Sequence, residues 1–170
     1  MADHALKTIL LSKLMEVEGA MLALQRMNQQ QEMVKAQFPL AYSIDVHAAS
    51  VSNHVQGAYT QAEGLLKQVL ELTDGKIPKS ETWHQDLIRL AGTKVPGVRE
   101  ALLDEQGMQS MRAALGFRHV VRSNYAGSLD PDRVFEQISN LEAATNAVAE
   151  GIRELLGAPR PESQPVERGG

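Results

Sequence analysis

The residues best suited to chemistry lie in residues 106–129, a stretch of 24 positions without Asp or Glu. Its charged side chains are Arg112, Arg118 and Arg122, and His119 lies among them. An arginine suits a phosphate because its planar guanidinium donates two parallel hydrogen bonds, and a histidine exchanges a proton near neutral pH. The whole chain carries a formal net charge of −4, so this stretch is a local cationic segment in an acidic protein.

Helical spacing brings three polar side chains of this stretch together. Arg118, Arg122 and Tyr125 follow one another at steps of four and three residues, so on a helix they lie within about 60° of one another. They continue a line that Met111 and Leu115 begin, so that an apolar face becomes cationic. Burying two arginines without partners would be costly. We therefore expect either that acids from other segments pair with them, or that they line a groove that receives an anion.

The segments that position this face are predicted to be helices, because single prolines are separated by long stretches without proline. Apolar residues recur in steps of three and four in these stretches, and no segment alternates apolar and polar residues as a strand does. The predicted elements are two long helices joined by Phe38–Ser43, a short helix Glu81–Ala91 capped by Ser80, one helical turn at 98–103, a helix Glu105–Ser123, and a last helix beginning at Pro131 behind Asp130. The fold class is all-α, an up-down bundle of four main helices plus a short helix.

Composition bounds the organisation and excludes several classes of function. The chain has 170 residues, enough for one domain with a core. We expect a helical domain over 1–156 and a disordered tail over 157–170, which is rich in Pro and Gly and poor in large apolar residues. The chain has no Cys, which excludes disulfides, thiolate metal sites and thiol nucleophiles, and its aromatic content of 4% argues against a base-stacking sheet. No apolar run is long enough for a membrane helix, so we expect a cytoplasmic protein.

The sequence GFRHVVRSNY at residues 116–125, followed by Leu129 and Asp130, resembles the signature of HepT-like HEPN proteins. That signature is an arginine, a few residues, a histidine, one residue and a tyrosine, on the penultimate helix of a bundle. Three upstream segments, at 74–78, 81–87 and 96–99, also resemble one branch of this family. The resemblance covers about residues 58–156.

The resemblance implies a function and partners. HepT-like proteins are toxins of toxin–antitoxin pairs, typically homodimers that cut RNA without a metal or cofactor, with the motifs of both protomers in one cleft. The partner is an MNT-type nucleotidyltransferase antitoxin that attaches AMP to the motif tyrosine. By position, Arg118 is the motif arginine and Tyr125 the tyrosine that is modified.

The sequence departs from the signature at Ser123, where the motif histidine is expected. A serine hydroxyl does not accept a proton unaided at neutral pH. One interpretation is that His119 transfers the proton instead. A second is that Arg112 and His119, which lie about 20° apart on a helix, form the motif with a looser spacing. A third is that cleavage is lost and binding is kept.

If the protein cuts RNA, the 2′-hydroxyl attacks the adjacent phosphorus, His119 takes or returns a proton, and Arg118 and Arg122 stabilise the charge on the phosphate oxygens. Further candidate RNA contacts are Arg112, Ser123 and His84. Two alternatives to a nuclease remain. One is a non-catalytic module that binds a nucleotidyltransferase or RNA, and the other is a structural bundle that dimerises through the face from Met111 to Tyr125.

Other conspicuous side chains are interpreted as structural. His47 and His54 lie seven residues apart on one helix face, too far apart to share a metal ion, and we predict that both belong to a polar surface. Trp83 is predicted to be a packing anchor, and beside it His84 is predicted to bond a loop carbonyl. No metal site is predicted.

Overall fold

The computed structural model describes residues 2–75, 77–123 and 129–158, which form five α-helices and no strand. The helices are α1 (Ala2–Gln37), α2 (Ile44–Asp74), α3 (Trp83–Ala91), α4 (Glu105–Ser123) and α5 (Pro131–Leu156). The predicted all-α bundle is therefore confirmed. The tail predicted to be disordered falls mostly on residues 159–170, which lie outside the described residues.

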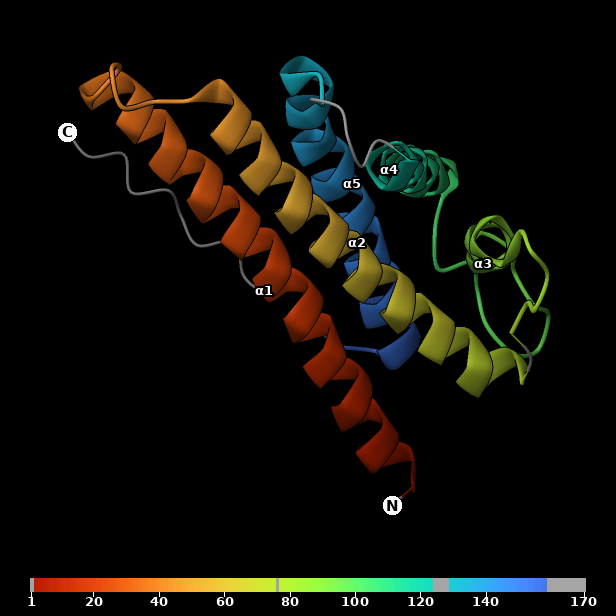
Figure 1. Ribbon diagram of the computed structural model, residues 1–170. Coiled ribbons are helices and arrows are strands. Elements are labelled where there is room, and N and C mark those ends of the chain that lie inside the picture. The colour runs from red at the N-terminus through yellow and green to blue at the C-terminus, as the bar shows by residue number, and fades with distance from the viewer. Residues whose placement is uncertain (1, 76, 124–128, 159–170) are drawn as a thin grey trace.

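Helix α2 is the centre of the bundle, because it packs against all four other helices. Figure 1 shows α1, α2 and α5 running side by side, with α1 and α2 as the antiparallel pair that the short connection predicted. Helix α4 is seen nearly along its axis in this view, so it crosses the other long helices. Helices α3 and α4 pack on the side of α2 that faces away from α1. This arrangement places one face of α2 opposite the cationic helix α4.

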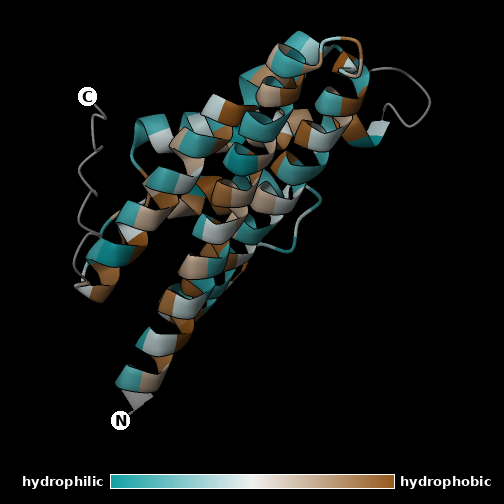
Figure 2. Cartoon of the chain, turned by 90° about the vertical axis from the view of Figure 1, so that its left-hand side faces the viewer, coloured by the Kyte–Doolittle hydropathy of each residue, from teal (hydrophilic) through white to brown (hydrophobic). Residues whose placement is uncertain are grey.

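The core follows the predicted apolar periodicity. The buried side chains of α1 recur in steps of three and four and are Leu10, Leu14, Val17, Met21 and Leu24. Figure 2 shows how polar and apolar residues alternate around the helices, so that each presents one apolar side to its neighbours. Ile44 and Leu72, at the two ends of the predicted apolar stripe of α2, are each 46% exposed, so the core includes only the middle of this stripe.

The predicted ends of the helices are mostly correct, with one exception. Asp130 caps α5 by accepting a hydrogen bond from the backbone N–H of Asp132 at 3.1 Å, and Gly75 ends α2 with a positive φ of 69°. Ser80 does not cap α3. The helix begins at Trp83, and the Ser80 hydroxyl donates to the Asp86 carboxylate at 2.8 Å.

The segment between α3 and α4 does not form the predicted helical turn. Val95 and Arg99 form an isolated antiparallel bridge, and Arg99 turns its side chain inward. Its guanidinium donates to both carboxylate oxygens of Asp74, at 2.8 and 2.7 Å, and to the carbonyls of Thr93 and Leu90. These bonds tie the segment to the end of α2, and they outweigh the local preference for a helical turn.

Among the described residues, no helix is both long enough and apolar enough to span a bilayer.

Candidate functional site

The candidate site is built around Glu63, a residue of α2 that is only 5% exposed, so that its carboxylate lies in the interior. Its Oε2 accepts a hydrogen bond from Nη1 of Arg118 on α4 at 3.1 Å. Its Oε1 accepts from the hydroxyl of Tyr59 at 2.9 Å and bonds Nδ1 of His84 on α3. A buried carboxylate needs such partners, because leaving it without them costs several kcal/mol. Three helices therefore meet at one carboxylate, and we call Tyr59, Glu63, His84 and Arg118 the Glu63 cluster.

Tyr59 is the most deeply buried member of the Glu63 cluster. Its side chain is buried, and the guanidinium carbon of Arg118 lies 5.8 Å from the centre of its ring, within the range of a cation–π contact. Burial, followed by the adjacent charge of Glu63, raises the pKa of the Tyr59 hydroxyl far above its usual value. Tyr59 therefore stays a neutral donor that orients the carboxylate.

His84 is fixed from two directions. One ring nitrogen bonds Glu63, and the ring stacks on Trp83 with centroids 3.7 Å apart and planes inclined by 29°. Trp83 in turn lies below the ammonium group of Lys67, which is 5.5 Å from the centre of its ring. Trp83 is half-buried against the core, so it packs as predicted. His84 bonds a carboxylate rather than the loop carbonyl that the sequence suggested.

A groove lies between α2 and α4 beside this cluster, with a volume of about 580 Å³. Its described lining combines two arginines with neutral polar side chains and one apolar residue: Asn53, Gln56, Thr60, Arg118, Val121 and Arg122. None of these lining residues is acidic. Arg122 is exposed and has no ion pair with any described residue, whereas Arg118 is 20% exposed and uses only Nη1 on Glu63. Both expectations for the two arginines are therefore met in part, since an acid pairs with one while both line a groove.

The other predicted site residues that the structure describes do not line this groove. His119 is exposed, and its ring lies 6.4 Å from that of His84 in an edge-on arrangement. Ser123 is exposed and donates to the carbonyl of Val120 at 3.1 Å. Arg112 lies outside the groove and faces Glu105 at 4.0 Å. Tyr125 lies outside the described residues.

One prediction about the surroundings of the site is wrong, and one alternative is restricted. His47 does not belong to a polar surface, because its ring is fully buried and bonds Asn28 at 2.8 Å and Tyr42 at 3.0 Å. Met111 and Leu115 are buried within the protomer, so this part of the face from Met111 to Tyr125 is not available to a second copy. Both findings have one cause, since helical spacing shows which residues share a face but not which helix covers it.

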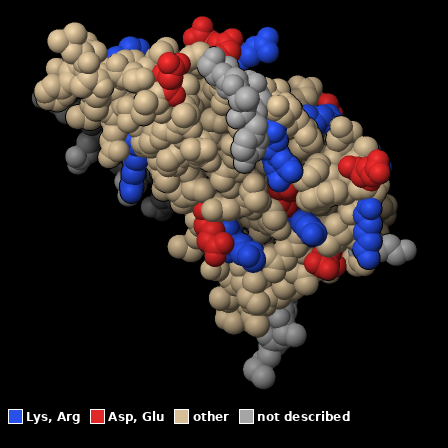
Figure 3. Space-filling model, viewed as in Figure 1, with Lys and Arg blue, Asp and Glu red and all other residues tan. Residues whose placement is uncertain are grey.

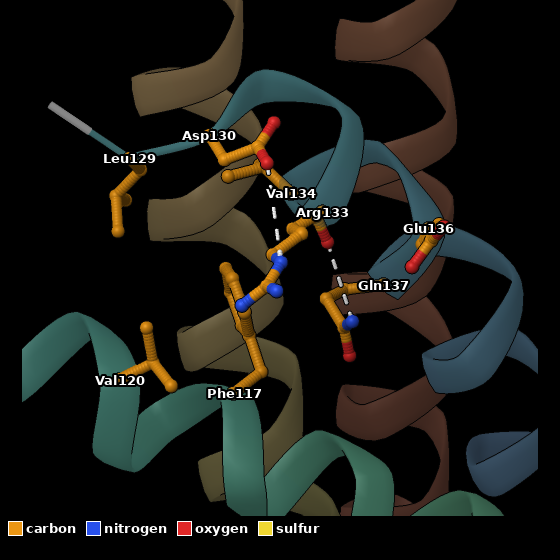
Figure 4. A pocket seen from close by; sticks show the side chains of 8 residues that line it. All are labelled: Phe117, Val120, Leu129, Asp130, Arg133, Val134, Glu136 and Gln137. Atoms are coloured by element: carbon orange, nitrogen blue, oxygen red, sulfur yellow. Dashed lines mark hydrogen bonds and ion pairs between the residues drawn. The ribbon is translucent and has the colours of Figure 1, made fainter.

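A second hollow of about 430 Å³ lies on the other side of α4, against the start of α5. Figure 4 shows Phe117 and Val120 of α4 facing Leu129 and Val134, with the Arg133 side chain reaching across from α5. The Arg133 guanidinium lies 3.9 Å from the Asp130 carboxylate. No predicted site residue lines this hollow, and it contains acids as well as a cation.

The face of the molecule drawn in Figure 3 carries no broad basic patch among the described residues. On the face drawn in Figure 3, basic and acidic side chains of the described residues alternate over a largely uncharged surface. Within the described ranges, no three His, Asp or Glu side chains are arranged to hold a metal ion. The cationic character of the site is therefore local and comes from Arg118 and Arg122.

The sequence contains a signal for Glu63 that lies outside the signature at residues 116–125. Along α2 the buried residues Ser52, Tyr59 and Glu63 are polar members of an apolar face. An acid four residues after a tyrosine on a buried face must find a cation or a donor. The groove residues Asn53, Gln56 and Thr60 carry no comparable signal, since exposed amides and hydroxyls are ordinary on a helix surface.

Comparison with known proteins identifies the family of the chain. The family model described as HepT-like protein matches residues 50–158, which is more than half of the chain and includes every residue of the Glu63 cluster and of the groove. No curated protein and no solved structure matches the chain. The chain therefore belongs to the HepT-like family.

Proposed function

We propose that this protein is the toxin of a toxin–antitoxin pair, a homodimeric endoribonuclease that needs no metal and is silenced when an MNT-type nucleotidyltransferase attaches AMP to Tyr125. The observation that carries the proposal is the groove in which Arg118 and Arg122 meet neutral hydrogen-bonding side chains without an acid among the described lining residues. Membership in the HepT-like family supports it.

The groove has the properties that an RNA backbone requires. A phosphate gains most from a guanidinium that is already oriented, because less conformational entropy is then lost on binding. Glu63 orients Arg118 through Nη1, and no other guanidinium nitrogen of Arg118 has a partner among the described residues. Asn53, Gln56 and Thr60 can bond ribose hydroxyls without repelling phosphate.

The chemistry needs a nucleophile that RNA itself provides. The 2′-hydroxyl attacks the adjacent phosphorus, and Arg118 and Arg122 stabilise the negative charge that builds on the phosphate oxygens. His119 is exposed next to Arg118 and can exchange a proton with the reacting oxygens. AMP on Tyr125 would add negative charge three positions after Arg122 in the sequence, which would oppose the binding of a phosphate by the arginines.

Cleavage of RNA by the purified protein tests the proposal. We expect the wild-type protein to cut a single-stranded oligoribonucleotide in the presence of EDTA, and Arg118→Ala to lower the rate by at least about 100-fold, as loss of a transition-state donor does. Arg26→Ala on α1 is the matched control, since it removes an exposed arginine far from the groove. Intact RNA with folded wild-type protein would refute the nuclease.

The modification and the partner need separate measurements. After co-expression with an MNT-type nucleotidyltransferase, the intact mass should rise by one or more AMP units, located on Tyr125 by peptide mapping. Expression of the unmodified protein should stop growth, and co-expression should restore it. Light scattering should give the mass of a dimer. The mass of a monomer would refute a cleft formed by two protomers.

A non-catalytic binding module is the second candidate, favoured by the ion pair between Arg118 and Glu63 and by the serine at position 123. In this case Arg118 would be partly neutralised and the groove would hold RNA or the nucleotidyltransferase without chemistry. Binding of the oligoribonucleotide without any cleavage, lost in Arg122→Ala, would favour this function. Cleavage by the wild-type protein would rule it out.

A further inference from the structure

We infer that His84, held by Glu63, is the proton acceptor that Ser123 cannot be, and that it works with His119 of the same protomer. The inference rests on the proposed ribonuclease function and deepens it. It places both proton-transferring groups in one chain, with His84 contributed by α3 rather than by the arginine-containing helix α4.

The contact with Glu63 sets the protonation pattern of the His84 ring. A carboxylate oxygen only accepts hydrogen bonds, so Nδ1 of His84 carries the hydrogen in this contact. The basic lone pair then lies on Nε2, for which the described residues offer no hydrogen-bond partner. A negative charge at Nδ1 also stabilises the imidazolium that forms when Nε2 accepts a proton. His84 therefore has the arrangement of a general base oriented by an acid.

The same carboxylate couples the base to the phosphate-binding group. One oxygen of Glu63 bonds His84 and the other bonds Arg118, so the base and the guanidinium are fixed relative to each other. Stacking on Trp83 holds the His84 ring in its plane. The His84 side chain is 18% exposed and that of Arg118 is 20% exposed, so both side chains reach the surface beside the groove that Arg118 lines. Glu63 is thus a positioning residue for both.

A second histidine is needed, because cleavage by the 2′-hydroxyl requires one group to take a proton and another to give one. The ring of His119 lies 6.4 Å from that of His84 and nearly perpendicular to it. In the proposed complex a phosphodiester linkage lies beside the two rings, with the attacking oxygen near His84 and the leaving oxygen near His119. No other described pair of histidine rings is in contact near Arg118.

The step balances without a metal or redox partner. Nε2 of neutral His84 takes the proton of the 2′-hydroxyl, the bond from the 2′-oxygen to phosphorus forms, and the bond from phosphorus to the 5′-oxygen breaks. The imidazolium of His119 gives its proton to that 5′-oxygen. The products are a 2′,3′-cyclic phosphate and a 5′-hydroxyl, and exchange of protons with water restores both histidines.

Cleavage of a fluorogenic oligonucleotide with a single ribonucleotide by the purified full-length protein tests the inference. His84→Ala should lower the turnover about 100- to 10,000-fold, the range for loss of a general base, while changing the affinity for the oligonucleotide less than about threefold. Added imidazole should restore part of the turnover, because a free base can occupy the vacated space. His4→Ala, which removes a histidine at the far end of α1, should behave as wild type.

A second variant keeps the test decisive if His84→Ala is poorly folded. The amide nitrogen of asparagine can donate to Glu63 as Nδ1 does, so His84→Asn should keep the wild-type melting temperature and lose turnover. Full turnover in His84→Asn would overturn the inference and leave the nuclease intact. Equal loss of binding and turnover, without rescue by imidazole, would also overturn it, since it would show a structural role. Failure of the wild-type protein to cut would overturn the inference and the proposed nuclease together.

Discussion

Helix α2 carries two carboxylates that bind arginines, and the two pairs differ in how completely the guanidinium is satisfied. Arg99 has a fully buried side chain, and it donates from all three nitrogens to Asp74 and to backbone carbonyls. Arg118 donates to Glu63 from one nitrogen, and its side chain is 20% exposed at the groove. The first pair is complete within the protein, whereas the second has donors left for a ligand.

This difference separates a structural arginine from a functional one. The hydrogen bonds of Arg99 hold the segment between α3 and α4 in place. Because all three guanidinium nitrogens already have partners, Arg99 has no nitrogen left to bind a ligand. In the Glu63 cluster the carboxylate is the satisfied partner, with Tyr59, His84 and Arg118 around it. We therefore expect loss of Arg99 to affect stability and loss of Arg118 to affect function.

The largest expected effect is on the Arg99 pair. Arg99→Met should lower the free energy of unfolding by about 3 to 5 kcal/mol, because it leaves Asp74 without a cation, with only the Thr73 hydroxyl still donating to it, and frees the segment at 92–104. Chemical denaturation would measure it. Arg89→Met, which removes an exposed arginine that pairs with Asp86, should cost less than about 1 kcal/mol. Equal losses of stability in the two variants would show that the buried hydrogen bonds of Arg99 stabilise the protein no more than an exposed ion pair does.

The next effect tests whether the segment held by Arg99 is rigid. A Cβ at Gly151 on α5 would lie 1.9 Å from the carbonyl oxygen of Leu102, which belongs to this segment. Gly151→Ala should therefore destabilise the protein by about 1 to 3 kcal/mol, as overpacking does. Gly19→Ala on α1 meets open space and should stabilise by about 0.5 to 1 kcal/mol. A neutral Gly151→Ala in thermal unfolding would show that the segment yields easily.

A smaller effect on stability is expected in the Glu63 cluster. Arg118→Ala should cost about 1 to 2 kcal/mol, because Glu63 keeps its bonds to Tyr59 and His84 when the arginine is lost. Its effect on RNA cleavage should far exceed its effect on the melting temperature. A loss of stability as large as that of Arg99→Met would mean that Arg118 is a structural residue and would remove it from the site.

The smallest effect is a dependence on pH that belongs to the Asp74–Arg99 pair. Hydrogen bonding to Arg99 holds the pKa of the Asp74 carboxyl below its ordinary value of 3.8. Folding thus favours the ionised carboxylate of Asp74. The contribution of this carboxylate to stability is complete above pH 3.8 and is lost as the pH falls below that value. The difference in unfolding free energy between wild type and Asp74→Asn should shrink on acidification below 3.8. A constant difference across this range would show that the charge of Asp74 does not stabilise the fold.

The helices could be predicted from the sequence because their determinants are local. Apolar steps of three and four, the cap at Asp130 and the prolines depend on neighbours within a few residues, and the predicted span Glu105–Ser123 is that of α4. The alignment of Arg118 and Arg122 depends only on helical geometry. The segment around Arg99 was mispredicted because a distant carboxylate on α2 outweighed the local preference for a helical turn.

The sequence by itself determined the bundle, the local cationic segment and the family. Only the tertiary structure decided what each polar side chain meets: that His47 is buried against Asn28 and Tyr42, and that Glu63 joins Arg118 across 55 positions of the chain. The physical reason is that a helix sets which residues share a face, while the partner of that face depends on packing between helices distant in sequence. The chemistry of the site arises from such contacts, because a buried carboxylate orients whichever donors the packing brings to it.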